Sequence, residues 1–76
     1  MRKQFKVGDT VTVATSWGRG IWVEAEIIAY ERGGRKGHDV IDYKVIKAEP
    51  GYPVGAVHWA YTDQIMKVNG SVIHND

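Results

Sequence analysis

The sequence contains no cysteine among its 76 residues. A disulfide framework and a cysteine-based zinc site are therefore both excluded as means of stabilising this short chain. No long apolar run is present, which argues against a transmembrane helix and a secretory signal peptide. Hydrophobic residues make up 43% of the chain, and three Trp and four Tyr are among its aromatic residues. We therefore expect a cytoplasmic protein with one core of aliphatic and aromatic side chains.

Sustained helical periodicity is also missing, and strict alternation of apolar and polar residues takes its place. Segment 10–15, which follows a Gly-Asp turn, places Val11 and Val13 on one face and threonines on the other. Segment 21–30 alternates in the same way, as a half-buried strand requires. The predicted strands are 10–15, 21–30, 40–48, 56–61 and 65–68.

The order of these segments predicts the fold class. We expect an all-β, five-stranded antiparallel SH3-like barrel over residues 1–70, with residues 71–76 as a flexible C-terminal tail. A single helical turn at 62–64, capped by Thr62 or Asp63, should precede the last strand. An OB-fold is the alternative with five strands, but it usually places a helix between its third and fourth strands.

The alternation also predicts which side chains are buried. In segment 56–61, Val57, Trp59 and Tyr61 share one face, and we expect that face to belong to the core. Trp22 falls on the outward face of its segment. The predicted core residues are Val11, Val13, Val23, Ala25, Ile27, Tyr43, Val45, Val57 and Ile65.

Four short motifs resemble a known family. They are Gly8-Asp9-x-Val11-x-Val13, Trp22-x-x-Ala25-x-Ile27, Asp42-Tyr43-x-Val45 and Tyr61-x-x-Gln64-Ile65. Together they resemble the Tudor/Agenet branch of the SH3-like barrels. The resemblance implies a ligand-binding module, in which an aromatic cage holds methylated lysine or arginine or, in some members, the surface binds nucleic acid. The matching aromatic positions are Trp17, Trp22 and Tyr52.

Positive charge is concentrated in the first half of the chain. Residues 1–38 carry seven Lys/Arg and four acids, whereas residues 39–76 carry three Lys/Arg and five acids. Part of the excess lies in the glycine-rich stretch RGGRKGH at 32–38, whose cations could approach phosphates from several angles. A tryptophan and an arginine in the loop at 16–20 add the pairing of cation and aromatic that single-stranded nucleic acid favours. The predicted nucleic-acid-binding residues are Trp17, Arg19, Arg32, Arg35, Lys36 and His38.

No pattern of residues indicates catalysis. The three histidines lack a metal-ligand spacing, the serines have no nearby histidine–acid pattern, and RGGRKG is not a Walker loop. We therefore expect a non-enzymatic binding module without metal or cofactor. Its partner is either nucleic acid or a protein.

In the protein-binding alternative the chain is a stand-alone regulator or inhibitor, of the kind that phages and mobile elements encode. It would dock through the aromatic residues Trp17, Trp22 and Tyr52. Exposed strand edges also allow a homodimer by strand pairing.

Overall fold

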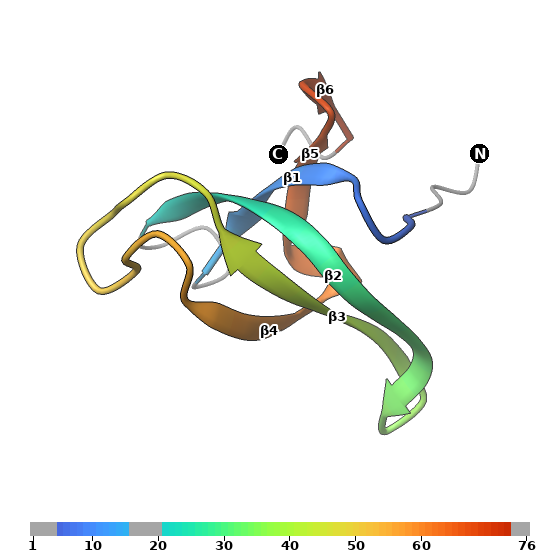
Figure 1. The fold of residues 1–76 in the computed structure, drawn as a ribbon. Coiled ribbons are helices and arrows are strands. Elements are labelled where there is room, and N and C mark those ends of the chain that lie inside the picture. Colours follow the sequence, from blue (N-terminus) through green and yellow to red (C-terminus); the bar gives the residue numbers. More distant parts are fainter. Residues whose placement is uncertain (1–4, 16–20, 74–76) are drawn as a thin grey trace.

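The computed structural model describes residues 5–15 and 21–73, which form one antiparallel sheet in the strand order β4-β3-β2-β1-β5-β6 (Figure 1). Its elements are β1 (Thr10–Ala14), β2 (Trp22–Arg35), β3 (His38–Val45), β4 (Val57–Tyr61), the 3-10 turn η1 (Thr62–Gln64), β5 (Ile65–Val68) and β6 (Ser71–Val72). The predicted all-β class and the single helical turn before β5 are confirmed. The sheet has six strands rather than five, and it is not closed into a barrel, because β4 and β6 remain as its two edges.

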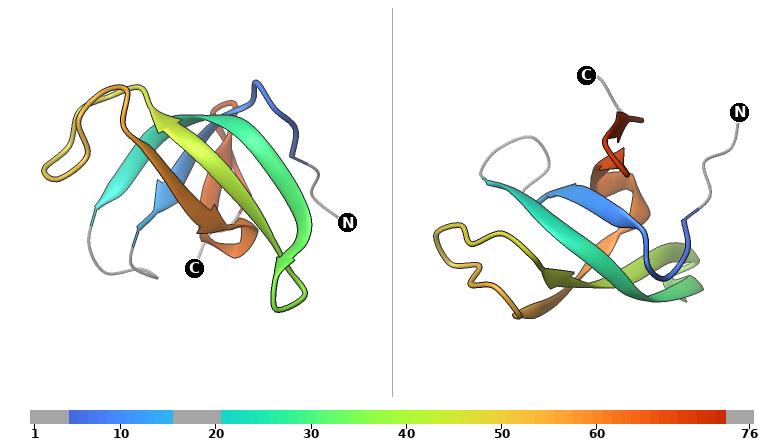
Figure 2. Two further views of the ribbon diagram at one scale, coloured as in Figure 1. Left: turned by 60° about the horizontal axis from the view of Figure 1, so that its bottom comes forward. Right: turned by 45° about the horizontal axis from the view of Figure 1, so that its top comes forward.

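Strand β2 is longer than the sequence predicted, and its second half extends beyond the centre of the sheet. It ends at Arg35 instead of residue 30, and β3 starts at His38. Two shifts of register against β3 bend the pair, and the hairpin projects beyond the other strands (Figures 1 and 2). Lys36 and Gly37 form the turn, with φ of 52° and 81°, as a type I′ hairpin turn requires. The predicted adaptable loop at 32–38 is therefore a bulge at 32–34 and a tight turn at 36–37, with Arg35 and His38 paired between them.

The core lies on the concave face of the sheet and matches the prediction closely. The residues predicted for the core are buried except those of β4: Val57 and Trp59 are exposed and Tyr61 is half-buried. Ile27 and Val13 are fully inaccessible to solvent. Ile41 and Ala60 complete the cluster. Trp22, predicted to face outward, is 47% exposed.

The predicted face of β4 is wrong. Val57 is 55% and Trp59 44% exposed, whereas Ala60 is buried. The register explains the reversal, because Ala60 lies opposite the buried Ile41, and directly opposed residues of two paired strands face the same side. A change of one residue in phase moves every side chain of a strand to the other face.

A histidine fills the inner side of β4 in place of the expected tryptophan. The His58 ring lies between Tyr43 and Tyr52, with centroid distances of 5.9 and 4.9 Å. Burial raises the pKa of Tyr43 to about 12, because the low-dielectric surroundings disfavour the phenolate. The His58 Nε2 atom is buried and has no hydrogen-bond partner among the described residues. Three rings thus close the core at this edge, and the register places Trp59 on the opposite face of β4.

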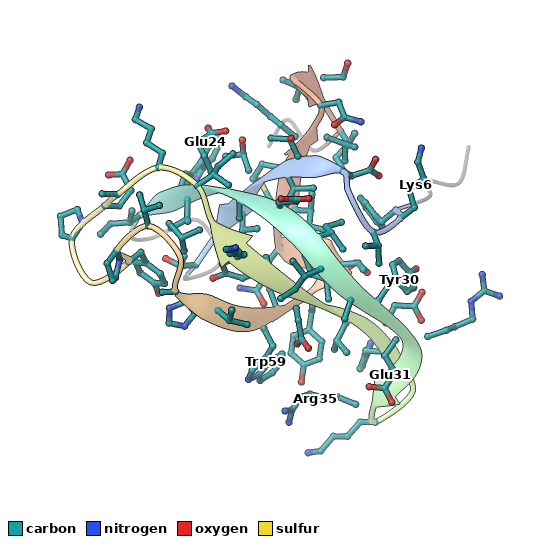
Figure 3. All side chains as sticks on the ribbon, in the orientation of Figure 1. Lys6, Glu24, Tyr30, Glu31, Arg35 and Trp59 are labelled. Atoms are coloured by element: carbon teal, nitrogen blue, oxygen red, sulfur yellow. The ribbon has the colours of Figure 1, made fainter. Side chains whose placement is uncertain are left out.

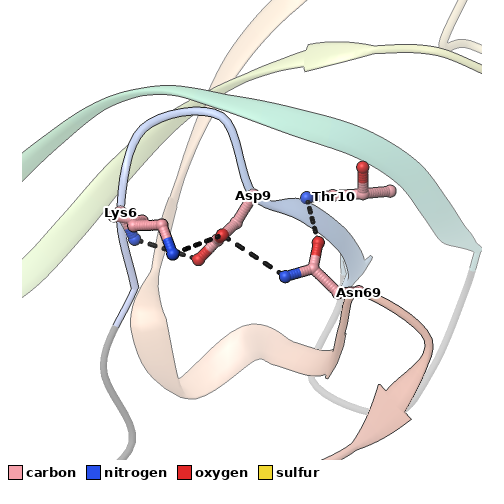
Figure 4. A network of polar contacts seen from close by, with 4 residues as sticks. All are labelled: Lys6, Asp9, Thr10 and Asn69. Atoms are coloured by element: carbon pink, nitrogen blue, oxygen red, sulfur yellow. Dashed lines mark hydrogen bonds and ion pairs between the residues drawn. The ribbon is translucent and has the colours of Figure 1, made fainter.

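A polar clasp joins the start of β1 to the end of β5 (Figure 4). The buried Asp9 carboxylate accepts a hydrogen bond from the Lys6 backbone N–H at 3.1 Å and another from Asn69 Nδ2 at 3.4 Å. Asn69 Oδ1 in turn accepts from the backbone N–H of Thr10 at 3.0 Å. The clasp gives the buried carboxylate the partners that a buried charge needs.

The sixth strand follows an Asn-Gly turn at 69–70, where the barrel predicted over residues 1–70 was expected to end. Asn69 and Gly70 have φ of 50° and 87°, the left-handed pair of an Asn-Gly hairpin turn. Ser71 and Val72 then pair with β5, and the Ile73 N–H donates to the Met66 carbonyl at 2.8 Å.

The cap of η1 also differs from the prediction. Neither Thr62 nor Asp63 caps the turn. The Gln64 side chain accepts from the Tyr61 backbone N–H at 3.1 Å and donates to the Ala14 carbonyl at 3.0 Å. One buried amide thus serves both the helical turn and the end of β1.

Candidate nucleic-acid interface

The far end of the β2–β3 hairpin is shaped by a bulge. Residues 32–34 of β2 lie opposite the single residue Asp39 of β3. The Asp39 carboxylate accepts from the Gly33 backbone N–H at 2.9 Å and from the Tyr30 hydroxyl at 2.8 Å. Gly33 has a φ of 65°, a conformation that favours glycine. The glycines of RGGRKGH therefore build a defined bulge, and this bulge fixes the direction of the residue that follows it, Arg35.

Arg35 lies against an aromatic side chain from β4. Its Cζ atom is 3.9 Å from the centroid of the Trp59 ring, and the two side chains point toward each other in Figure 3. Trp59 meets Tyr61 edge to face at 5.1 Å, and Tyr61 meets His38 in the same way at 5.7 Å. With Lys36 at the turn, these side chains form one continuous surface, here called the basic–aromatic surface: Arg35, Lys36, His38, Trp59 and Tyr61.

The cations of this surface keep their charge available for an external partner. Arg35 and Lys36 are both exposed. Within residues 5–15 and 21–73 the ion pair of Lys6 with Asp9 is the only one, so neither Arg35 nor Lys36 is neutralised by a described carboxylate. A cation–π contact at an exposed site contributes about 0.5–1 kcal/mol and orients the guanidinium without neutralising it.

A hollow opens beside the basic–aromatic surface. It has a volume of about 230 Å³ and is lined by Lys36, His38, Tyr61 and Asp63. Asp63 is exposed and belongs to η1, which begins where β4 ends. The hollow therefore combines a cation, two rings and one carboxylate.

The structure brings together some of the predicted site residues and separates others. Arg35, Lys36 and His38 are gathered on the basic–aromatic surface, and Arg32 is exposed on the same hairpin, within the bulge. Trp17 and Arg19 lie outside the described residues.

The two remaining predicted aromatic residues lie elsewhere. Trp22 lies at the opposite end of β2 from Arg35. Tyr52 is half-buried and packs against the core and His58. Among the described residues, no ring contact joins either of them to the basic–aromatic surface.

Three residues of the site were missed by the sequence analysis: Trp59, Tyr61 and Asp63. Alternation within 56–61 defines two faces, and both contain residues that can be buried. Only the pairing with β3 decides between them, and a single sequence does not state that register.

Comparison of the chain with protein-family models, curated proteins and solved structures finds no match. Among residues 5–15 and 21–73, no group of three or more acidic or histidine side chains is arranged to hold a metal ion. The same residues include no helix with the length and hydropathy needed to cross a membrane.

Proposed function

We propose that this chain is a small non-enzymatic protein that binds single-stranded nucleic acid through the basic–aromatic surface. The observation that carries the proposal is the contact of Arg35 with Trp59 at 3.9 Å. It joins a cation and a large ring from separate strands on an exposed surface. This is the combination with which proteins hold single strands, by phosphate contact and base stacking.

The geometry of the contact between Arg35 and Trp59 suits both phosphate contact and base stacking. The N–H donors of a guanidinium lie in its plane, so stacking on Trp59 leaves them available to a phosphate. Bases stack on aromatic rings and on guanidinium planes alike. A methylated lysine or arginine, the cage ligand of the Tudor/Agenet family, is disfavoured here, because Arg35 and Lys36 would repel its positive charge.

The affinity for single strands should fall steeply as the salt concentration rises, even though the binding surface is small. Each phosphate contact on a single strand contributes about −0.7 to the slope of log affinity against log salt. We expect the triple replacement of Arg32, Arg35 and Lys36 by Ala to flatten this slope by about 2 and to weaken binding uniformly across sequences. Fluorescence anisotropy with labelled single- and double-stranded oligonucleotides at several salt concentrations measures both effects.

Lys47→Ala is the matched control for this experiment. Lys47 is exposed beyond the other end of β3, away from the hairpin, so its removal should leave the slope nearly unchanged. The proposal is wrong if the unaltered protein binds no probe at low salt, or if Lys47→Ala flattens the slope as much as the triple replacement.

A relation to the SH3-like small barrels, in their Tudor/Agenet branch, is part of the proposal. The order of elements supports it: a long β2–β3 hairpin, a short β4, a 3-10 turn and a β5 that pairs with β1. The open edge between β4 and β6 is the departure from that fold.

Docking on a protein is the second candidate function, and an exposed apolar face supports it. On the outer side of the sheet Trp22, Ile46 and Val57 are 47%, 46% and 55% exposed. Apolar side chains gathered on one face are typical of interaction surfaces. Co-purification of a partner from lysate that survives nuclease treatment and is lost in Trp22→Ala would favour this candidate.

A further inference from the structure

We infer that the hollow beside Asp63 is a binding site for a single nucleobase and that it prefers guanine. The inference rests on the proposed function and deepens it. It assigns a sequence preference to a surface that is otherwise proposed only to contact phosphates and to stack on bases. The observation behind it is a carboxylate beside two rings in a hollow of about 230 Å³, at the border of a cationic surface.

The walls of the hollow suit a flat, neutral ligand. The His38 and Tyr61 rings meet at an interplanar angle of 74°, so they do not stack on each other. Lys36 stands on the same rim and can hold the phosphate that is attached to the bound nucleotide. The hollow thus offers ring contact for a base and charge for its backbone.

The Asp63 carboxylate is available for recognition. It is exposed, and it makes no hydrogen bond or ion pair within residues 5–15 and 21–73. A carboxylate is an acceptor only, with two oxygens that can take two parallel donors. On a surface proposed to bind a polyanion such a group repels phosphate, and the hydrogen-bond donors of a base edge offer it a favourable contact instead.

Guanine presents the donors that a carboxylate needs. The Watson–Crick edge of guanine carries the ring N1–H beside the N2 amino group, and both can donate to one carboxylate. Cytosine and adenine present one amino group beside an acceptor nitrogen. Uracil and thymine present one N–H between two carbonyl oxygens, which a carboxylate repels. The expected order is therefore guanine, then cytosine and adenine, then uracil or thymine.

The charges of the hollow exclude the simpler ligands. An isolated phosphate would meet the Asp63 carboxylate, and a cation would meet Lys36 and the nearby Arg35. A neutral base attached to an anionic backbone satisfies both charges at once.

The test uses the full chain and thymidine oligonucleotides that carry one guanine, cytosine or adenine at a central position. A single guanine avoids the self-association of guanine runs. In fluorescence anisotropy at low salt, the strand with guanine should bind roughly fivefold or more tightly than the all-thymidine strand. Asp63→Asn should abolish this preference, because an amide offers one acceptor and one donor instead of two acceptors.

Asp42→Asn is the matched control. Asp42 is an exposed residue of β3 directly opposite Trp59, and it does not line the hollow. Both replacements remove one negative charge, so both should strengthen binding of the all-thymidine strand slightly. Only Asp63→Asn should change the ratio between guanine and thymidine strands.

The outcomes separate the two claims. If the protein binds single strands without a preference for guanine, or if Asp63→Asn leaves the preference unchanged, the guanine site is wrong and the proposed function stands. If no strand binds at low salt, both are wrong. Far-ultraviolet circular dichroism of each variant confirms that the sheet is intact.

Discussion

The two halves of β2 differ in burial and in pairing. Residues 22–26 pair with β1 and residues 25–27 pair with β3, and Val23, Ala25 and Ile27 are fully buried between more exposed neighbours. In residues 31–35 only Glu31 and Arg35 pair with β3, none pairs with β1, and all five are exposed. The first half is fixed by the hydrophobic core, and the second half has no core to join.

The second half is held by polar contacts instead. The Asp39 carboxylate fixes the bulge at Gly33, and Trp59 holds the guanidinium of Arg35. Segments with exposed backbone hydrogen bonds and little apolar burial are the first to open locally. A strand extended into solvent in this way contributes little to stability. Under the proposed function, its contribution is the side chains that it presents to the ligand.

The strongest test of this contrast compares two adjacent isoleucines in β2. Ile27 is fully buried and Ile28 is 40% exposed. Ile27→Ala should lower the free energy of unfolding by about 2–5 kcal/mol, because it removes apolar contacts and leaves a cavity in a small core. Ile28→Ala should lower it far less. Urea denaturation followed by circular dichroism measures both, and equal losses would show that the two faces of the strand are not distinct.

A smaller effect is expected from the two exposed tryptophans. Trp59 is 44% and Trp22 47% exposed, but Trp59 is the one beside Arg35. Trp59→Ala should weaken single-strand binding by about 1–3 kcal/mol, the contribution of a stacked base, without changing the salt slope. Trp22→Ala should leave the affinity unchanged. Anisotropy titrations measure both, and a larger loss in Trp22→Ala would place the binding surface at the opposite end of β2.

The smallest effect concerns the bulge. Asp39→Ala removes the acceptor of the Gly33 N–H and the Tyr30 hydroxyl, so the end of the hairpin should loosen. We expect a loss of about 1–2 kcal/mol in the free energy of unfolding and a severalfold weaker affinity, although Asp39 itself carries charge of the wrong sign to contact phosphate. Hydrogen exchange at Gly33 and anisotropy measure these effects. Unchanged exchange would show that the bulge does not depend on this carboxylate.

The parts of this fold that could be predicted are the strands whose alternating apolar residues pack into the single hydrophobic core. The pattern of β1 and of the first half of β2 predicted both strands and their buried faces. The face of β4 could not be predicted, because Val57, Trp59 and Tyr61 look as suitable for burial as Ala60 and His58 until the register with β3 is known.

The candidate site was predictable only in part, for the same reason. The cations Arg35 and Lys36 stand out in the sequence as a basic cluster. Their aromatic partner Trp59 lies 24 positions after Arg35 and meets it only through the three-strand arrangement of β2, β3 and β4. Local sequence reports charge and turn chemistry, and long-range pairing decides which side chains share a surface.

The clasp between Asp9 and Asn69 bears on the order in which the protein can assemble during synthesis. The two residues are 60 positions apart, so every residue up to Asn69 must leave the ribosome before Asp9 can meet this partner. The β2–β3 hairpin needs no such distant partner and can form while the rest is still being made. The segment proposed to bind nucleic acid is therefore available for pairing early, and the core that supports it is completed late.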